Sequence, residues 1–173
     1  PCPVAPDPRC VVSGTWPESV ERVAAFLRAA GAEARLEEYP EATATAEAAA
    51  DAVGCTLGQI VKSLVASCDG VLHLVLVPGD RRLDTGRVAA VTGAQRVKIA
   101  TAEQVVAATG FEPGGVAPFP PGEIESVVVD RSLLRHSIVW VGGGSARHMV
   151  ALAPLELVRL TRGRVEPVGQ ESA

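Results

Sequence analysis

The stretch 59–78, QIVKSLVASCDGVLHLVLVP, decides the fold of this chain. It holds two apolar, β-rich segments, 59–67 and 71–77, with Cys68, Asp69 and Gly70 between them. An Asp-Gly pair between two such segments is a strong signal of a tight hairpin turn. The sequence therefore predicts an antiparallel hairpin, which the Pro-Gly-Asp of residues 78–80 closes at its far end.

Helices and strands interleave irregularly on both sides of this hairpin. Thr15 and Glu18 stand at capping-box spacing and predict a helix that ends at Gly31, and Thr101 with Gln104 predicts a second such start. The other patterns predict strands over 34–39, 96–100, 126–130, 137–141 and 147–152, helices over 43–53, 83–92 and 154–160, and a closing strand or tail over 164–168. This order favours an α/β domain of the α+β type, with helices packed outside a mixed, curled sheet.

Length and composition agree with a single compact domain. The chain has 173 residues, of which 47% are apolar and only 3% aromatic, so Val, Ala and Leu must fill the core. We expect an irregular Pro-rich tail over 1–14, the domain over 15–168 and a short C-terminal tail over 169–173. The net charge of −4 argues against a protein that depends on non-specific phosphate contacts.

The sequence predicts a cytoplasmic protein without a membrane partner. No stretch approaches 18 uncharged apolar residues, and the start of the chain lacks the basic and apolar regions of a signal peptide. Cys2, Cys10, Cys55 and Cys68 form no CxxC pair, so we expect free thiols and no metal site. A disulfide between Cys2 and Cys10 remains open.

Lys62 is the most informative single residue. In an extended 59–67 segment it lies on the same face as Ile60 and Leu64, where a lysine is costly unless its ammonium reaches a partner. Two interpretations remain open from the pattern alone. One is a lysine that protects an edge strand from aggregation, and the other is a cation at the mouth of a cleft that holds an anionic substrate.

Two glycine-containing segments are further candidates. In the loop 110–122, the run from Gly114 to Pro118 combines glycine freedom with proline stiffness and can present backbone groups to a ligand; the alternative is an ordinary surface connection. The run 142–144 follows a strand directly and can form an anion-binding nest or an oxyanion hole, although it matches neither GxGxxG nor a P-loop. His148 follows shortly after, but a lone histidine is more often packed or exposed than catalytic.

Three segments, in this order and in register, resemble one family. Residues 59–64 (QIVKSL) resemble its Q-[VI]-x-K-[ST]-L strand, and residues 109–118 (TGFEPGGVAP) resemble its T-G-[YF]-x-x-G-G-[VI]-[AS]-P loop. Residues 139–144 (VWVGGG) resemble its strand that ends in a glycine pair. The family is the YbaK/prolyl-tRNA-synthetase-associated aminoacyl-tRNA editing domain, and the resemblance extends over residues 38–160.

The resemblance implies a compact α/β domain with a curled mixed sheet, or partly open barrel, in agreement with the patterns above. It implies hydrolysis of the ester that joins a small wrong amino acid to tRNA, commonly the tRNA for proline. Because the chain has no room for the catalytic domains of a synthetase, a free-standing editor that acts in trans is implied. Its implied partners are the acceptor end of a mischarged tRNA and an aminoacyl-tRNA synthetase, with no DNA, membrane, metal or cofactor.

The resemblance also implies roles for individual residues. Lys62 matches the family's essential lysine, whose compact ammonium suits the phosphate or sugar of the terminal adenosine. The loop that begins at Gly114 positions the aminoacyl group and the attacking water through its backbone. Lys62 and Gly114 are thus the expected catalytic positions, and the expected substrate-binding positions are Gly115, Val116, Ala117, Pro118, Gly143, Gly144 and His148.

Some positions depart from the family pattern. Pro120 stands where many members have glycine, and Gly142 and Met149 stand where the cysteine-editing branch carries Ser and Asp, which puts cysteine specificity in doubt. The acidic net charge favours recognition of little beyond the acceptor end. An alternative function is a non-catalytic module of the same fold that binds a nucleotide end or a small ligand, because fold does not fix function.

Overall fold

The structure is a computed structural model and describes residues 15–171. Its helices are α1 (Glu18–Ala29), α2 (Ala46–Val53), α3 (Thr85–Thr92), α4 (Ala102–Thr109) and α5 (Pro154–Thr161), with the 3₁₀ turns η1 (Leu57–Gln59) and η2 (Arg131–Arg135). Its strands are β1 (Ala34–Glu38), β2 (Val61–Cys68), β3 (Val71–Pro78), β4 (Arg81–Leu83), β5 (Val97–Ile99), β6 (Ser126–Asp130), β7 (Val139–Gly142), β8 (His148–Leu152), β9 (Arg164–Glu166) and β10 (Gly169–Glu171).

The predicted hairpin is confirmed. Strands β2 and β3 pair antiparallel from Val61 opposite Pro78 to Cys68 opposite Val71. Asp69 and Gly70 form the turn with φ angles of 51° and 92°, the left-handed conformation that this type of two-residue turn requires. This hairpin is the centre of a five-stranded sheet in the order β5-β2-β3-β6-β9.

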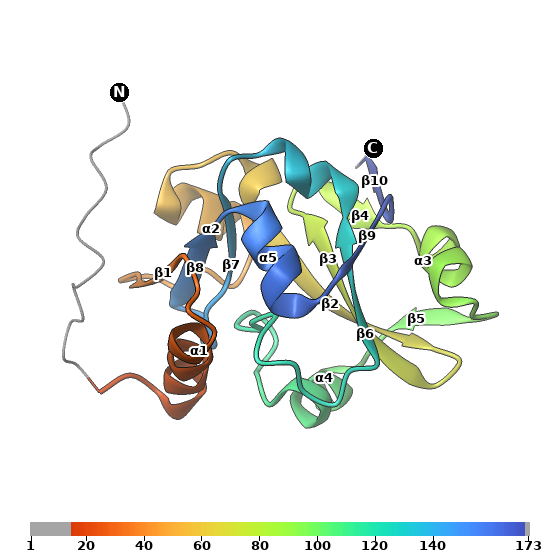
Figure 1. The fold of residues 1–173 in the computed structure, drawn as a ribbon, viewed down its shortest axis with the longest axis horizontal. Helices are drawn as coiled ribbons and strands as arrows, with labels where there is room; N and C mark the ends of the chain where they lie inside the picture. The colour runs from red at the N-terminus through yellow and green to blue at the C-terminus, as the bar shows by residue number, and fades with distance from the viewer. Residues whose placement is uncertain (1–14, 172–173) are drawn as a thin grey trace.

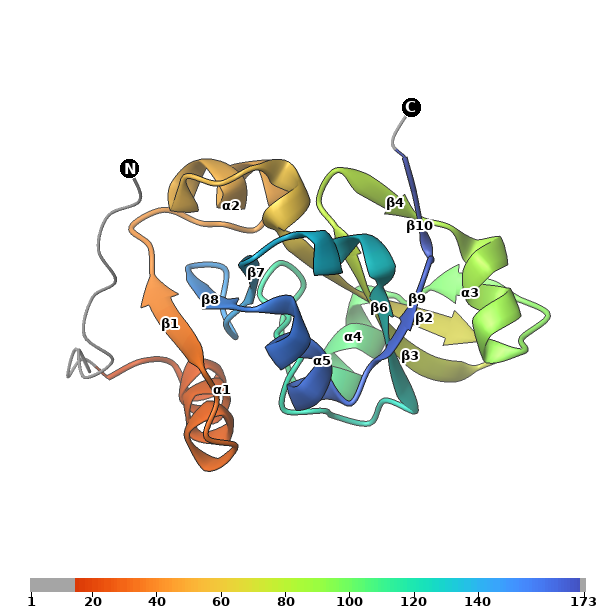
Figure 2. The same cartoon turned by 45° about the horizontal axis from the view of Figure 1, so that its top comes forward.

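The sheets form an open, curled arrangement with helices outside it (Figures 1 and 2). In the five-stranded sheet β6 and β9 run parallel to their neighbours, and β5 runs antiparallel to β2, so the sheet is mixed. A three-stranded sheet, β1-β8-β7, continues it through a parallel bridge between Ile60 and Trp140. The predicted fold class, a mixed sheet flanked by helices in one domain, is confirmed.

Aliphatic side chains fill the core on both faces of the central hairpin. Val61 and Val65 of β2 pack in the larger cluster with Leu76, whereas Ala66 and Cys68, which point to the other face, pack in a second cluster around Val88 of α3. A third cluster joins α2 to the bridge between the sheets and contains Ala49, Ile60, Trp140, Met149 and Ala151.

Several element boundaries differ from the sequence expectation. The capping box at Thr15 is wrong, because Pro17 is the N-cap of α1 and makes no side-chain cap hydrogen bond. The box at Thr101 and Gln104 is confirmed. The second helix begins later than expected, because the Thr45 hydroxyl accepts the Ala48 N–H and so caps α2 at that point.

The end of the described chain contains one strand that the sequence did not reveal. Residues 169–171, which we assigned to a C-terminal tail, form β10 and pair antiparallel with β4. Residues 1–14, with Cys2 and Cys10, lie outside the described residues, so the tail and the disulfide are not addressed. No helix within residues 15–171 combines the length and the apolar character that crossing a bilayer requires.

Candidate active site

The two halves of β2 have different neighbours along one edge. Strand β5 pairs with residues 66–68, and the Ala100 N–H donates to the Val65 carbonyl at 2.8 Å. Within residues 15–171 no strand pairs with residues 61–64 on that side, although the bridge at Ile60 lies just before them. We call residues 61–64 the open half of β2 and residues 65–68 its covered half.

The backbone of the open half faces a cavity. Successive residues of a strand direct their backbone groups to opposite edges, and the Val65 carbonyl points away from β3 to Ala100. The N–H and C=O of Ser63 therefore also point away from β3. The Ser63 hydroxyl is buried and has no hydrogen-bond partner among the described residues, while the residue as a whole keeps partial exposure. The Ser63 backbone therefore lies at the cavity that residues 61–64 line.

The cavity has a volume of about 280 Å³ and brings together four segments that are distant in sequence. Besides the open half of β2, it is lined by residues 43–46 before and at the start of α2, by Gly114 and Val116 of the long loop, and by Gly142 and Met149 of β7 and β8. Ala46 and Glu47 begin α2, so the electropositive end of this helix lies at the cavity.

Lys62 is the one charged residue among the described residues that line this cavity. Its ammonium donates to the Arg81 carbonyl of β4, which satisfies one of its three donors. Burial lowers the pKa of the Lys62 ammonium below its ordinary range; Glu47 and Asp80 oppose this shift, and Arg82 adds to it. A half-buried cation with two remaining donors can bind an anionic or hydroxyl-bearing ligand.

The 3₁₀ turn η1 places Lys62 by fixing the start of β2. Thr56 and Gln59 form a capping box around η1, and the Gln59 amide donates to the Ile138 carbonyl at 3.1 Å. The Ile60 carbonyl then accepts the Gly79 N–H at 2.7 Å. These contacts fix the backbone of residues 56–60, immediately before the lysine.

The loop from Gly114 to Pro118 lies across the cavity from β2. Gly114 has φ of 89° and lines the cavity, and a Cβ on it would lie 3.1 Å from the Ala44 Cβ. Val116 lines the cavity as well, whereas Gly115, Ala117 and Pro118 are buried and do not line it. The loop is therefore a packed wall whose exposed part is Gly114.

The glycine run 142–144 allows this wall to pack closely. A Cβ on Gly142 would overlap the Val116 carbonyl oxygen, and a Cβ on Gly144 would lie 2.7 Å from the Ser19 carbonyl oxygen. The Gly143 N–H donates to the His148 carbonyl at 2.8 Å, and the Gly144 N–H donates to the Gly115 carbonyl at 3.1 Å. Because both N–H groups are engaged, these two glycines form no free anion nest here, and Gly142 lines the cavity instead of them.

His148 lies on the other face of the three-stranded sheet. It precedes Met149, which lines the cavity, so its side chain points to the opposite face of β8. Its ring meets Trp16 edge-on at 5.6 Å, and its Nδ1 lies 2.6 Å from the Ser145 hydroxyl. Burial lowers the pKa of the imidazole. The structure does not bring His148 to the cavity that contains Lys62.

Sequence reasoning missed three parts of the site. Residues 43–46 carry no motif, because small residues before an Ala-rich helix are common. Ser63 was given no role because Lys62 beside it carried the stronger signal. The Arg81 carbonyl is a backbone group, which no pattern of side chains reveals. Within residues 15–171 no group of three or more His, Cys, Asp or Glu residues is arranged to hold a metal ion.

The chain is similar to known proteins over most of its length. The model of the family described as "Aminoacyl-tRNA editing domain" matches residues 40–160. "Uncharacterized protein YwhH" of Bacillus subtilis is 30% identical over 131 residues, which cover 75% of this chain and 83% of that protein. "Putative Cys-tRNA(Pro)/Cys-tRNA(Cys) deacylase EbsC" of Enterococcus faecalis is 26% identical over 121 residues, which cover 69% of this chain and 74% of that protein.

Longer relatives and solved structures match as well. A "Proline--tRNA ligase" of Lactobacillus johnsonii is 29% identical over 112 residues, 65% of this chain but only 20% of the ligase. The solved structure described as "Crystal structure of a putative trans-editing enzyme for prolyl tRNA synthetase" superposes with a TM-score of 0.84 and 36% identity. That superposition covers 90% of this chain and 99% of the other.

Proposed function

The chain belongs to the aminoacyl-tRNA editing domain family, and from this premise we propose that it is a deacylase that hydrolyses the ester of a mischarged tRNA. The single observation that carries the proposal is the position of Lys62, which lines the same cavity as Gly114 and whose half-buried ammonium donates to the Arg81 carbonyl. The lysine of an edge strand that only prevents aggregation would point to bulk solvent instead.

We assign Lys62 to the 3′-terminal nucleotide of the tRNA. An ammonium attracts phosphate as a point charge, and the first residues of α2 line the same cavity, at the positive end of the helix dipole. The cavity thus offers two sources of positive potential. The Arg81 carbonyl holds the ammonium through one donor, which leaves two donors to bind the ligand.

The reaction requires little chemical assistance from the protein. Water attacks the carbonyl carbon of the aminoacyl ester, the bond to the ribose oxygen breaks, and that oxygen takes a proton, which releases a free amino acid and the tRNA. Backbone groups of the Gly114 loop and of Ser63 are suited to hold the aminoacyl group and the water, because fixed dipoles and positioning supply much of the rate of such reactions.

We further propose that the substrate is a tRNA for proline that carries a small wrong amino acid, and that the chain acts in trans. Relatives named for a Cys-tRNA(Pro) deacylase and for trans-editing support this assignment, as does the limited cavity of about 280 Å³. The net charge of −4 favours contacts that are confined to the acceptor end.

A panel of mischarged tRNAs tests the proposal. The tRNA for proline carrying alanine, cysteine, serine or threonine is incubated with the chain, with prolyl-tRNA as the control substrate and uncatalysed hydrolysis subtracted. We expect hydrolysis of at least one small ester and none of prolyl-tRNA. Saturable binding of 3′-aminoacyl analogues without hydrolysis of any ester would contradict the proposal and favour a binding module of the same fold.

A further inference from the structure

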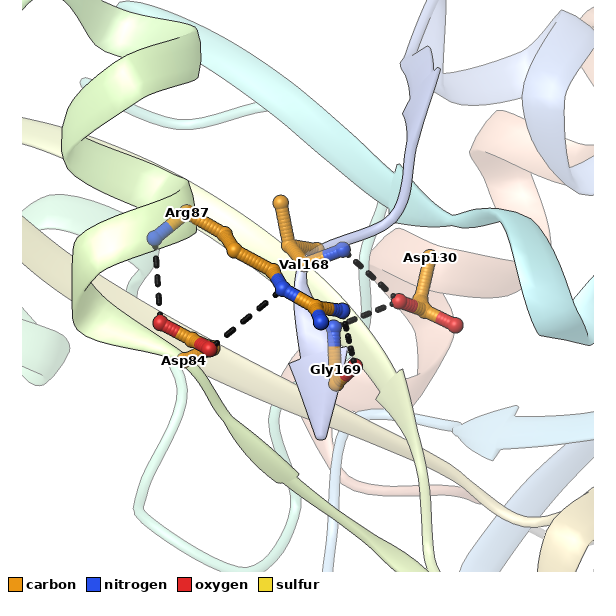
Figure 3. Close-up of polar contacts among 5 residues, drawn as sticks. All are labelled: Asp84, Arg87, Asp130, Val168 and Gly169. Atoms are coloured by element: carbon orange, nitrogen blue, oxygen red, sulfur yellow. Dashed lines mark hydrogen bonds and ion pairs between the residues drawn. The ribbon is translucent and has the colours of Figure 1, made fainter. Parts of the chain in front are cut away.

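A buried carboxylate holds the last described strand of the chain. Asp130 ends β6, is 1% exposed, and accepts the Val168 N–H at 2.9 Å and the Gly169 N–H at 2.6 Å through one oxygen (Figure 3). Its other oxygen accepts the Ser132 N–H at 3.0 Å and the Ser132 hydroxyl. Backbone hydrogen bonds to a charged carboxylate are stronger than those between neutral groups.

Val168 and Gly169 are also held by hydrogen bonds from α3 and the residue before it. The Asp84 N–H donates to the Val168 carbonyl at 2.8 Å. Figure 3 shows that the Arg87 guanidinium donates to the Gly169 carbonyl, at 3.1 Å, while it pairs with the Asp84 carboxylate. Val168 itself is fully buried. We call Asp130, Val168 and Gly169 the C-terminal clamp.

The C-terminal clamp sets the register of β10 on β4. Gly169 stands opposite Leu83, Gln170 opposite Arg82, and Glu171 opposite Arg81. Since Val168 and Asp84 form a hydrogen-bonded pair, the alternation of an antiparallel ladder makes Gln170 and Arg82 the next such pair. The Arg82 N–H therefore points to β10.

One peptide unit connects β10 to Lys62. The Arg82 N–H and the Arg81 carbonyl belong to the same planar, trans peptide, so they point in opposite directions. The N–H side faces β10, and the carbonyl side accepts the Lys62 ammonium. Within residues 15–171, β10 is the one strand that pairs with β4.

We propose that Asp130 is a positioning residue for Lys62, which it controls by clamping β10 onto β4 and so fixing the Arg81–Arg82 peptide. The expected effect of Asp130 on the deacylation rate rests on the proposed function, whereas its expected effect on the position of Lys62 does not. Strands β9 and β10 follow residue 160, where the match to the family model ends. The clamp therefore lets a segment outside the matched region act on the cavity.

A matched pair of proline variants tests the clamp. Gln170→Pro removes the N–H that faces the Arg82 carbonyl, and its ring disturbs the pairing of β10 with β4, whereas Glu171→Pro replaces an N–H that points away from β4 and leaves the ladder intact. Asp130→Asn with Ser132→Ala forms a second pair. Asparagine has one acceptor oxygen in place of two and no charge, so it cannot accept from both the Val168–Gly169 pair and Ser132, while the alanine removes only the Ser132 hydroxyl.

The chain provides a direct readout, because Lys62 and Lys98 are its two lysines. Protein labelled with ¹³C-lysine gives two Cε signals, and Lys98, exposed in β5, is the internal reference. In Gln170→Pro and Asp130→Asn we expect the Lys62 signal to move, and its titration midpoint to rise toward that of a free lysine as the ammonium leaves its buried partner. Glu47, Asp80 and Arg82 are the charged groups that face it and remain in all four variants.

Activity is measured on the same samples. We expect kcat to fall roughly ten- to a hundredfold in Gln170→Pro and Asp130→Asn, as for a misplaced catalytic group, and to stay unchanged in Glu171→Pro and Ser132→Ala. If the wild type has no deacylase activity but the Lys62 signal responds, the proposed function fails and the clamp stands. A Lys62 signal and a kcat that are unchanged in folded Gln170→Pro overturn the clamp.

A measurement on the wild type covers the case in which the variants do not fold. The ladder requires the Arg82 N–H, on an exposed residue, to be protected from hydrogen exchange. Protection similar to that of the β2–β3 ladder supports the clamp. Exchange of the Arg82 N–H at the rate of an unpaired surface amide would overturn it.

Discussion

The two halves of β2 lie on one strand and differ in what covers their outer edge. The covered half, residues 65–68, has β5 and Ala100 beside it, and its apolar side chains are buried in two core clusters. The open half, residues 61–64, has a cavity beside it and carries Lys62. In this molecule the candidate site lies where a sheet lacks a neighbouring strand.

This difference separates residues that serve stability from residues that serve the site. In the covered half a substitution opens a void in a packed core, which lowers the free energy of unfolding. In the open half the costly feature is a half-buried cation, whose removal relieves desolvation. Substitutions of Lys62 and of covered-half residues should therefore affect different measurements, whereas Val61 of the open half packs in the same core cluster as Val65.

The largest effect is expected at Lys62. Lys62→Met keeps the length of the side chain but removes the charge, so we predict a loss of at least about 10²-fold in kcat/KM, comparable to the removal of one preorganised charge-stabilising group. The melting temperature should stay the same or rise. Lys98→Met, in exposed β5, is the matched control and should keep full activity. Wild-type activity in Lys62→Met would show that Lys62 of the open half takes no part in the reaction.

The next largest effect on the rate is expected where the Gly114–Pro118 loop packs against Gly142. The Cβ introduced by Gly142→Ala would overlap the Val116 carbonyl oxygen and push the Gly114 loop toward or away from the cavity. We predict about a tenfold fall in kcat/KM, since displacement of positioning groups by a fraction of an ångström is costly. Gly86→Ala, in the first turn of α3, is the control and should change nothing measurable in the rate.

The covered half should show the reverse behaviour. Val65 is 2% exposed, and Val65→Ala leaves a void in the larger core cluster. We predict that the free energy of unfolding, measured by urea denaturation, falls by about 1–3 kcal/mol while kcat/KM is unchanged at temperatures where the variant is folded. A fall in kcat/KM at temperatures where Val65→Ala is folded would show that the two halves of β2 do not have separate roles.

The smallest effect is the pH dependence of Lys62. Its pKa is lowered by burial, so between that pKa and the ordinary value for lysine of about 10.4 the unfolded chain binds more protons at this site than the folded chain. Stability from this group therefore rises with pH in that window, whereas the rate falls because the ammonium is lost. The wild-type curves minus those of Lys62→Met isolate this contribution. A rate and a stability that change in the same direction would contradict the assignment.

The sequence predicted the parts of this fold that local chemistry determines. The Asp69–Gly70 turn, the Thr101 capping box and the family motif around Lys62 each depend on neighbouring residues, and each motif segment lies at the site or beside it. The role of the glycine run was harder to predict, because the engaged N–H groups of Gly143 and Gly144 depend on partners at His148 and Gly115. His148 was placed among the binding residues from its distance along the chain, but strand alternation directs it to the other face of β8.

The C-terminal strand shows why the remainder was not predictable. Residues 169–171 carry no apolar alternation, and they form a strand because Asp130, 39 residues earlier than Gly169, accepts the N–H groups of Val168 and Gly169 where the strand begins. Such long-range contacts between a side chain and the backbone produce no periodic pattern of apolar residues from which a strand could be predicted. The same applies to the Arg81 carbonyl, which reaches Lys62 through the fold.

The central claim is that the open half of β2 binds the aminoacylated 3′ end through Lys62. The most direct test adds a non-hydrolysable 3′-aminoacylamino-adenosine phosphate to protein labelled with ¹³C-lysine and ¹⁵N. We predict that the Lys62 Cε signal and the Ser63 and Gly114 amide signals shift with one common saturation curve, while Lys98 stays in place. Saturable binding that leaves Lys62, Ser63 and Gly114 unshifted would contradict the claim.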